Sequence, residues 1–407
     1  MSSTGTELTR TTVGSVTNQY KWTYSFWIKR SALGTGATNS FIFDWYQSSA
    51  NRGGILFESD NTFKIYDRVS NSNALDRRTN RLFRDPNAWY HFVIAHDRTV
   101  GSPLTKIYVN GVEETSFQSS SNPSQNGTSY FNTASQTERI GKYGNGNEYS
   151  QMIMSHVHFC DGYYYQASDF GSTDSTTGEW KINTSPSVTY GNNGYFILKD
   201  GNSLTDQSPN TNNFTVAGGT LTKTEDNPSN NFATINPLDN FYNNLTITNG
   251  NTSWVSTSPY SVTRSTLGAS SGKYYFEMKV VNEGNTDYEF GIVGKAATSI
   301  SSWMGSSGSF GYSYESTAEL RANGTTVDPW GSTYDDGDIL GCAFDLDNNK
   351  IYFSKNGSWQ QSGDPSSGSN GYTITAAADT PAGAYFVGAG DFSGSAGQSG
   401  QFNFGNG

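Results

Sequence analysis

The sequence has few cysteines, and their positions offer no disulfide framework. Among its 407 residues there are only two, Cys160 and Cys342, one in each half of the chain. A disulfide between them would need Cα atoms within about 7 Å of each other across two domains. We therefore expect two isolated core thiols, which imply nothing about an oxidising compartment.

Long apolar runs are missing as well. No stretch approaches the roughly 20 apolar residues that a membrane-spanning helix requires. Residues 1–6 have neither a basic start nor an apolar core, so we expect no secretory signal peptide. Runs of Ala, Leu, Glu and Lys, which long helices need, are absent too. We therefore predict little helix and no membrane insertion.

Charged residues are scarce, at 15% of the chain, and 25 basic against 36 acidic residues give a formal net charge of −11. Nucleic-acid binders normally carry a basic stripe, and an acidic chain repels the phosphate backbone. This balance argues against a nucleic-acid partner. The one basic cluster, residues 76–84, is interpreted as a solvated loop anchored to nearby carboxylates, with contact to a polyanion as the alternative.

Aromatic and turn-forming residues are abundant, with 45 Gly, 25 Tyr, 24 Phe and 9 Trp. Aromatic side chains suit a half-buried pleated surface, and Gly, Asn and Ser supply turns between short strands. Residues 21–29 alternate in the manner of a strand and place Trp22, Tyr24 and Phe26 on one face. The predicted fold class is all-β.

Length and pattern together predict two domains. A chain of 407 residues exceeds one ordinary sandwich and suits two, since domains usually hold roughly 100–200 residues. The Asn-Gly pairs at 110–111 and 356–357 predict tight hairpins, one in each half. Between residues 200 and 237 the apolar pattern dissolves into Asn, Ser, Thr, Asp and Pro. We predict a sandwich over 1–199, an irregular but packed connector over 200–237, and a sandwich over 238–407.

Two family resemblances rest on these segments. Residues 22–30, 83–93 and 106–112 resemble a laminin-G-like (concanavalin-A-like) domain. Residues 271–277, 336–347 and 350–357 resemble a SPRY domain. The resemblances imply two tandem antiparallel jelly-roll β-sandwiches of different families.

A narrower resemblance points to tailed bacteriophages, especially phages of marine cyanobacteria. Residues 122–126, 158–162 and 168–171 are similar to a branch of laminin-G-like domains in their virion proteins, and residues 230–239 resemble the joint to a SPRY domain there. This implies a capsid- or tail-attached appendage (decoration, knob or fibre-type) on the virion surface, made in the host cytoplasm. It would adhere to a host-surface glycan or protein, or dock to other virion subunits, as a homo-oligomer, with a trimer expected by analogy. A secreted or cell-surface lectin-like protein and, less favoured, a polysaccharide hydrolase are the alternatives.

Nothing in the sequence predicts catalysis. Retaining glycosidases need two carboxyl groups about 5–5.5 Å apart, and the nearest candidate pair, Asp287 and Glu289, is interpreted as a solvated strand edge. There are only four histidines, which are His91, His96, His156 and His158, and no Gly-x-Ser-x-Gly elbow accompanies them. His156 and His158 share a strand face, where they could ligate a metal, but two polar residues opposite core positions are favoured. We predict that the protein is not an enzyme.

Binding is expected at loops that carry aromatic residues, because Tyr and Trp give large, rigid contact areas. The candidates are Tyr163, Tyr164, Tyr165, Trp303 and Trp330, with local cover of the sandwich edges as the alternative. The laminin-G-like resemblance also implies a possible Ca²⁺ ion. Its ligands in that half form no contiguous motif. In the other half, an acidic cluster could hold such an ion or could simply cap turns and strand edges, and its members are Asp336, Asp338, Asp345 and Asp347.

Overall fold

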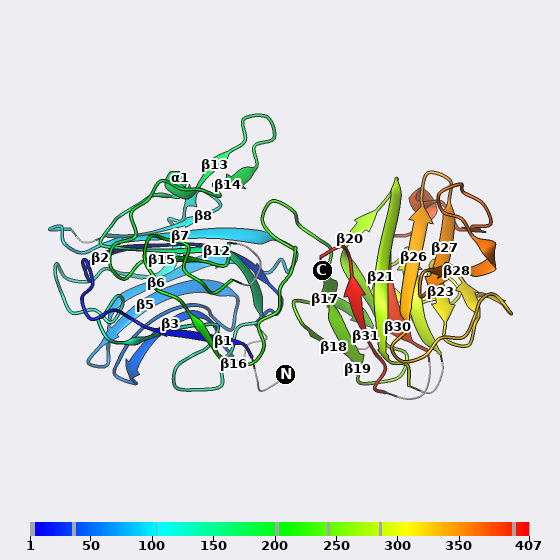
Figure 1. Cartoon of the computed structure of the whole chain (residues 1–407), viewed down its shortest axis with the longest axis horizontal. Helices are drawn as coiled ribbons and strands as arrows, with labels where there is room; N and C mark the ends of the chain where they lie inside the picture. Colours follow the sequence, from blue (N-terminus) through cyan, green and yellow to red (C-terminus); the bar gives the residue numbers. More distant parts are fainter. Residues whose placement is uncertain are drawn as a thin grey trace. The chain divides into compact units, whose positions relative to one another are not determined.

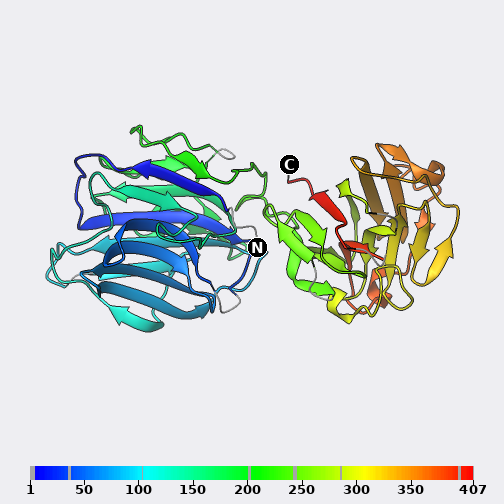
Figure 2. The ribbon, with the colours of Figure 1, turned by 90° about the horizontal axis from the view of Figure 1, so that it is seen from below.

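The computed structural model describes residues 5–34, 38–102, 104–199, 203–241, 245–284, 287–392 and 396–406. The chain divides into two compact units, Met1–Asn231 and Phe232–Gly407, each built almost entirely of antiparallel strands (Figures 1 and 2). The described helices are one turn of α-helix and three short 3₁₀ segments, α1 (Ala167–Phe170), η1 (Ala297–Ser299), η2 (Gln360–Ser362) and η3 (Ala377–Asp379). The predicted all-β class is confirmed.

The first unit contains two large sheets and a small hairpin. The strands of its eight-stranded sheet are β1 (Glu7–Thr11), β3 (Ser40–Ser48), β4 (Asn51–Phe57), β5 (Thr62–Val69), β6 (Ser72–Leu82), β10 (Phe117–Ser121), β11 (Thr137–Ile140) and β16 (Thr215–Gly218). Their order is β10-β6-β5-β4-β3-β11-β1-β16. The strands of the six-stranded sheet are β2 (Lys21–Arg30), β7 (Trp89–Asp97), β8 (Leu104–Val109), β9 (Val112–Glu113), β12 (Met152–Asp161) and β15 (Tyr195–Ile197), in the order β15-β12-β2-β7-β8-β9.

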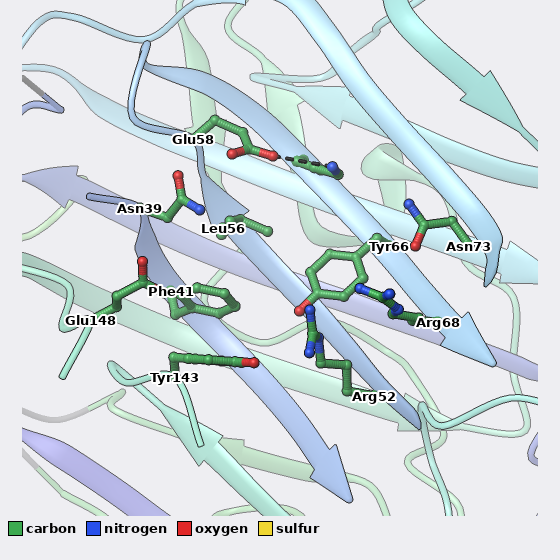
Figure 3. Close-up of a pocket in the computed structure, with 11 residues that line it drawn as sticks. Asn39, Phe41, Arg52, Leu56, Glu58, Tyr66, Arg68, Asn73, Tyr143 and Glu148 are labelled. Atoms are coloured by element: carbon green, nitrogen blue, oxygen red, sulfur yellow. Dashed lines mark ion pairs between the residues drawn. The ribbon is translucent and has the colours of Figure 1, made fainter. Parts of the chain in front are cut away.

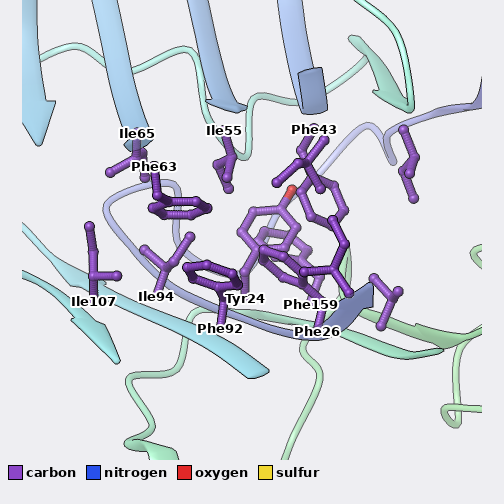
Figure 4. Packing of buried hydrophobic residues seen from close by; sticks show 14 of the residues in the cluster. Tyr24, Phe26, Phe43, Ile55, Phe63, Ile65, Phe92, Ile94, Ile107 and Phe159 are labelled. Atoms are coloured by element: carbon purple, nitrogen blue, oxygen red, sulfur yellow. The ribbon is translucent and has the colours of Figure 1, made fainter. Parts of the chain in front are cut away.

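The core of the first unit lies between these two sheets, where aromatic rings from both inner faces interlock (Figure 4). The prediction that one face of β2 carries Trp22, Tyr24 and Phe26 is confirmed, since all three side chains are fully buried in this core. Phe63 of β5 stacks on Phe92 of β7 across the interface, with ring centroids 4.2 Å apart. Each such buried apolar side chain contributes about 1.5–3 kcal/mol to folding.

The outer face of the six-stranded sheet is covered by a second layer. The segment after β12 forms α1 and the hairpin of β13 (Gly171–Thr173) and β14 (Trp180–Ile182), which lie above β7 and β8 in Figure 1. Phe170 and Tyr190 from this segment pack with Phe196 of β15 in a separate buried cluster. The six-stranded sheet is therefore buried on both faces.

Residues 203–231, which the sequence analysis assigned to a connector, contribute to the first unit. Strand β16 pairs with β1, and Asp226 forms a buried ion pair with Lys29 of β2 (2.7 Å). Residues 200–202, where the predicted domain boundary falls, lie outside the described residues. The two units meet in sequence at residues 231 and 232.

The second unit is also a pair of packed sheets. The strands of its seven-stranded sheet are β17 (Ile235–Phe241), β20 (Val262–Ala269), β22 (Tyr288–Val293), β23 (Gly311–Glu315), β24 (Leu320–Ala322), β25 (Thr325–Val327) and β30 (Tyr385–Asp391), in the order β17-β20-β30-β22-β23-β24-β25. The other sheet comprises β18 (Leu245–Thr248), β19 (Ser253–Ser256), β21 (Lys273–Asn282), β26 (Ile339–Asp345), β27 (Lys350–Lys355), β28 (Ser358–Trp359), β29 (Tyr372–Thr373) and β31 (Ser399–Asn403). Its order is β18-β19-β31-β21-β26-β27-β28, with β29 also paired to β27. Phe276 of β21 meets Phe290 of β22 in the core, with centroids 5.1 Å apart.

Both predicted hairpins have the expected backbone. Asn110 and Gly111 have φ of 49° and 81° between β8 and β9, and Asn356 and Gly357 have φ of 49° and 79° between β27 and β28. Positive φ at both central residues is what a type I′ turn requires.

The basic cluster at residues 76–84 is a strand rather than the predicted loop. Most of it belongs to β6, whose register with β5 places Arg78 opposite Lys64 and Arg77 opposite Ile65. Arg78 is indeed anchored to a carboxylate, that of Asp60 (2.6 Å). Period-2 alternation was hidden here because the outward and inward positions are both polar.

The two cysteines are free and buried, each in a different unit. None of the helices among the described residues has the length and apolar character needed to cross a membrane.

Candidate functional site

The predicted aromatic loop at residues 163–165 lies against the layer that covers the six-stranded sheet. Tyr165 packs on Phe170, and its hydroxyl accepts a hydrogen bond from the Thr189 amide (2.8 Å). Tyr164 is half-buried, and burial is the main cause of its raised pKa. Tyr163 is 37% exposed, so it is the ring of this loop that stands at the surface.

The two predicted tryptophans of the second unit differ from each other. Trp303 is half-buried and packs on Phe392, with ring centroids 4.3 Å apart. Trp330 is only 6% exposed and packs between Tyr314 and Phe353. Trp330 is therefore a core residue rather than part of an exposed loop.

The four predicted calcium ligands do not come together. Asp336 and Asp338 precede β26, whereas Asp345 and Asp347 lie at its other end, and a seven-residue strand spans roughly 20 Å. Within the described residues, no group of three or more His, Cys, Asp or Glu side chains gathers in a way that could hold a metal ion.

Each of these aspartates already has protein partners. Asp338 pairs with Lys355 (2.9 Å), and Asp345 pairs with Lys273 (3.1 Å). Asp336 and Asp347 accept hydrogen bonds from the backbone amides of residues 283 and 272. These contacts join the four carboxyl groups to turns and strand ends.

His91 is held in a form that cannot act as a base toward the serine beside it. Its Nε2 lies 2.9 Å from Ser25 Oγ, but its Nδ1 accepts a hydrogen bond from the indole N–H of Trp180 (2.9 Å). Burial lowers the pKa of His91 to about 3, so the ring is neutral and its proton is on Nε2. Nε2 therefore donates to the serine.

The remaining histidines are buried as well. Arg98 donates to Nε2 of His96 (3.1 Å), which leaves Nδ1 to donate to Thr105. His158 stacks on Phe196, with centroids 3.9 Å apart, and His156 is 9% exposed. Val157 occupies the core side of the strand as expected, yet the outer side is buried beneath the second layer.

A hollow of about 240 Å³ lies on the outer face of the first unit's eight-stranded sheet (Figure 3). Ile55 of β4 and Ile65 of β5 point into the core, so the residues that alternate with them along each strand point outward. The hollow is lined by Asn39, Phe41, Arg52, Leu56, Glu58, Lys64, Tyr66, Arg68, Asn73, Tyr143 and Glu148.

The floor of the hollow is aromatic and apolar. Phe41, Leu56 and Tyr66 are at least 93% buried and form a cluster with Tyr143. Tyr143 stacks on Phe41, with centroids 4.7 Å apart. Gly54 of β4 lies opposite Tyr66, and a Cβ there would come within 2.7 Å of the ring, so the glycine lets the ring lie across the strand.

Two arginines and two glutamates border different parts of the hollow. Arg52 and Arg68 are directly opposite each other on β4 and β5, beside the Tyr66 ring (Figure 3). Glu58 is paired with Lys64 (3.1 Å). Burial raises the pKa of Glu148, and the charge of Glu58 adds to that rise.

A buried carboxylate lies in the same face of the sheet, one strand away. Asp44 of β3 pairs with Gly54 in the register and is fully buried. Burial raises its pKa to about 7, and its Oδ2 accepts a hydrogen bond from the Gly144 amide (2.9 Å). Its Oδ1 has no hydrogen-bond partner. The charges of Arg139 and Arg52 partly offset this rise in the pKa of Asp44, but among the described residues no salt bridge joins Asp44 to Arg52.

Sequence reasoning missed the hollow, although part of its signal was readable. Arg52, Leu56 and Glu58 alternate with core residues on one strand, and Lys64, Tyr66 and Arg68 do so on the next. These polar and aromatic positions mark the outer faces of two strands. That the strands are neighbours in register, and that residues 143 and 148 close one side, is decided by the tertiary fold.

The architecture and the hollow define the chain as a two-domain, all-β protein of a kind suited to binding. Residues 3–162 match the family model described as the concanavalin A-like lectin/glucanases superfamily, and residues 273–407 match the SPRY domain. The chain thus carries a concanavalin A-like domain followed by a SPRY domain.

Curated relatives match over a short stretch. Ran-binding protein 9 of Danio rerio is 34% identical over 96 residues, or 22% of this chain and 15% of that protein. Its Homo sapiens counterpart is 35% identical over 96 residues and 12% of its length. The chain therefore spans less than one sixth of these relatives. Among solved structures, the SPRY domain of human HERC1 is similar at 18% identity, with a TM-score of 0.34 over 41% of this chain and 96% of that one.

Proposed function

We propose that this chain is a non-enzymatic adhesion protein whose first unit binds a glycan in the hollow over β3, β4 and β5. The second unit docks to a protein partner. The setting is the surface of a tailed-bacteriophage virion, where the chain forms a capsid- or tail-attached appendage that contacts the host surface or other virion subunits.

The hollow is the observation that carries the glycan assignment. Sugars are recognised by aromatic surfaces together with groups that hydrogen-bond to hydroxyls. Here Tyr143 and Tyr66 supply the rings, and Asn39, Asn73 and Glu148 supply amide and carboxyl groups around them. The volume of about 240 Å³ suits one ring of a longer chain better than a deeply enclosed small molecule.

Two features support the docking role and the virion setting. The SPRY-domain match and the Ran-binding relatives support a protein partner for the second unit. The resemblance of residues 122–126, 158–162 and 230–239 to phage virion proteins supports the setting.

The buried histidines support a non-enzymatic role. Ser25 and His91 are the nearest approach to a nucleophile and base, and Trp180 holds the imidazole in the wrong tautomer for that chemistry. Both groups are also inaccessible, with exposed fractions of 1% each.

A glycan array probed with the full chain tests the glycan assignment. Tyr143→Ala is expected to weaken binding about tenfold or more, because the ring borders the hollow. Tyr163→Ala is the matched control, since it removes an exposed tyrosine outside the hollow and leaves binding unchanged. If Tyr163→Ala alone abolished binding, the glycan site would lie at the loop of residues 163–165 instead of the hollow. Absence of binding to any glycan would refute the assignment.

The virion setting has a separate test. The protein should co-purify stoichiometrically with capsids or tails, and counting its copies on the particle tests the expected homotrimer. Recovery from the medium or a cell envelope, without particles, would instead support the secreted or cell-surface lectin.

One observation favours a second candidate, a polysaccharide hydrolase. Glu58 and Glu148 border the same hollow, and the raised pKa of Glu148 suits a general acid, while Glu58 is paired with Lys64. Release of reducing sugar from a bound polysaccharide, abolished by Glu148→Gln, would establish this activity. Binding without any such release supports the adhesion protein.

A further inference from the structure

Arg52 and Arg68 lie side by side in the hollow. They are directly opposite in the register of β4 and β5, yet neither belongs to a salt bridge among the described residues. Arg52 donates to the Ser49 carbonyl (2.9 Å), and Arg68 makes one long contact with the Asn71 side chain (3.4 Å). The Nε atoms of both arginines are buried and have no hydrogen-bond partner.

This arrangement is unfavourable for the protein alone. Like charges directly opposite on neighbouring strands repel each other, and a buried N–H without an acceptor loses its hydrogen bond to water. Other arginines of the same unit show the usual solution, since Arg10 pairs with Glu138 and Arg98 pairs with Asp67 (2.8 and 2.9 Å). The charge of Arg52 acts on the nearby carboxyl groups of Asp44 and Glu148, yet among the described residues neither carboxyl group forms a salt bridge with it.

The surroundings of the two arginines indicate which kind of ligand would accept hydrogen bonds from their N–H groups. The Arg52 guanidinium carbon lies 5.9 Å from the Tyr66 ring centroid and 5.5 Å from that of Tyr143, so it is held between the aromatic floor and wall. A guanidinium presents five N–H donors in a planar fork that matches a carboxylate or a sulfate. Asn73 lies beside Arg68 and adds an amide (Figure 3).

We propose that the hollow selects sugars that carry an anionic substituent, a carboxylate or a sulfate, which Arg52 and Arg68 bind together. This inference rests on the glycan-binding function proposed above and names its ligand class. The anionic group lies at the arginine end of the hollow, while Glu58 and Glu148 bind ring hydroxyls elsewhere in it. Those two carboxylates repel a ligand that is anionic throughout, so a sugar residue with one charged substituent fits better than a densely charged polymer.

Binding of the full chain to matched oligosaccharides tests the proposal. The probes are a neutral dextran oligomer, the same oligomer carrying a single terminal uronate, and the same oligomer carrying a single sulfate, with poly-glutamate as an acidic peptide. The expected result is at least about tenfold tighter binding of a uronate or sulfated oligomer than of the neutral one, weakening with salt. Which of the two anionic oligomers binds tells whether the substituent is a carboxylate or a sulfate.

Three variants identify the residues responsible. Arg52→Gln and Arg68→Gln are each expected to lower the ratio of anionic to neutral oligomer affinity about tenfold, which removes most of the preference. Arg68→Lys keeps the charge and retains part of the preference. Arg84→Gln is the matched control, because it removes the same charge from an exposed arginine of this unit that does not line the hollow. Unchanged melting temperatures show that the variants are folded.

The outcomes separate this inference from the function on which it rests. Equal binding of neutral and anionic oligomers, unaffected by Arg52→Gln and Arg68→Gln, overturns the anionic preference and leaves the glycan-binding function standing. Equal weakening by Arg84→Gln, or equally tight binding of poly-glutamate, shows nonspecific charge attraction and also overturns it. If no oligosaccharide of any class binds, the glycan-binding function itself fails.

Discussion

Removing the charge of Asp226 should destabilise the first unit, although this residue lies in a segment with no sequence signal for a domain. Its Oδ2 holds the ammonium group of Lys29 at 2.7 Å, and its Oδ1 accepts the indole N–H of Trp89 at 2.8 Å. The side chains of both ion-pair partners are 0–1% exposed. Asp226→Asn leaves the ammonium group of Lys29 buried without its counter-charge.

The expected magnitude follows from burial. Breaking a buried ion pair by removing one partner costs about 3–5 kcal/mol, because the remaining charge is uncompensated. Lys29 keeps the Asn231 side-chain oxygen at 2.8 Å, which favours the low end, about 3 kcal/mol. For a domain of this size, each kcal/mol shifts the melting temperature by about 2–4 °C, so we expect a fall of about 6–12 °C.

The neighbouring residue is a matched control. Glu225 pairs with Lys223 at the surface, where the two side chains are 56% and 61% exposed. Glu225→Gln removes the same charge one position away and should change stability by no more than about 0.5 kcal/mol. Calorimetry of the full chain resolves the transition of the first unit. A shift of less than about 2 °C for Asp226→Asn would refute the argument that residues 203–231 belong energetically to the first unit.

Three further predictions concern the second unit. Burial raises the pKa of Glu289 to about 7 and of Glu315 to about 8, above the ordinary value of 4.5. The two carboxyl groups contribute stability that is fully present below pH 4.5 and is lost as the pH rises through their folded-state pKa values of about 7 and about 8. The melting temperature should therefore fall between pH 4.5 and 8. Glu315→Gln should make this fall smaller. A melting temperature that rises with pH there would contradict the assignment. Trp330→Ala should lower the free energy of unfolding in urea by about 3–5 kcal/mol, because the ring is in the core, and should leave glycan binding by the first unit unchanged. A near-zero change in stability would contradict the core position of Trp330. Calcium or a chelator should leave the melting temperature unchanged, because lysines already pair with Asp338 and Asp345, and a calcium-dependent rise would revive the metal site.

Local pattern was enough for the fold class and for many of its details. Alternation along β2 predicted which side chains enter the core, since successive side chains of a strand point to opposite faces. The two Asn-Gly pairs predicted hairpins because few residues tolerate positive φ at both turn positions. Local pattern failed at β6, where both faces carry polar residues, and at Trp330, where an isolated aromatic residue between turn residues gives no sign of its depth.

The candidate site could not be predicted from the local sequence pattern, for a physical reason. A hollow is made by residues that are distant in the chain, and those here run from Asn39 to Glu148. Each lining residue also has an ordinary interpretation as a solvated outer-face position. The loop at residues 163–165 drew attention because its tyrosines are consecutive, yet most of that aromatic surface covers the six-stranded sheet.

By itself, then, the sequence determined that the two cysteines stand apart, that helices are scarce, and that two different β-sandwiches follow one another. The first two properties depend on composition and the β-strands on short-range alternation, while the difference between the two sandwiches rests on the family resemblances. Only the tertiary structure decided that Arg52 and Arg68 face each other, that Trp180 sets the tautomer of His91, and that Asp226 neutralises Lys29. Such pairings depend on strand register and on contacts across the sheets, which bring together residues that no local pattern connects.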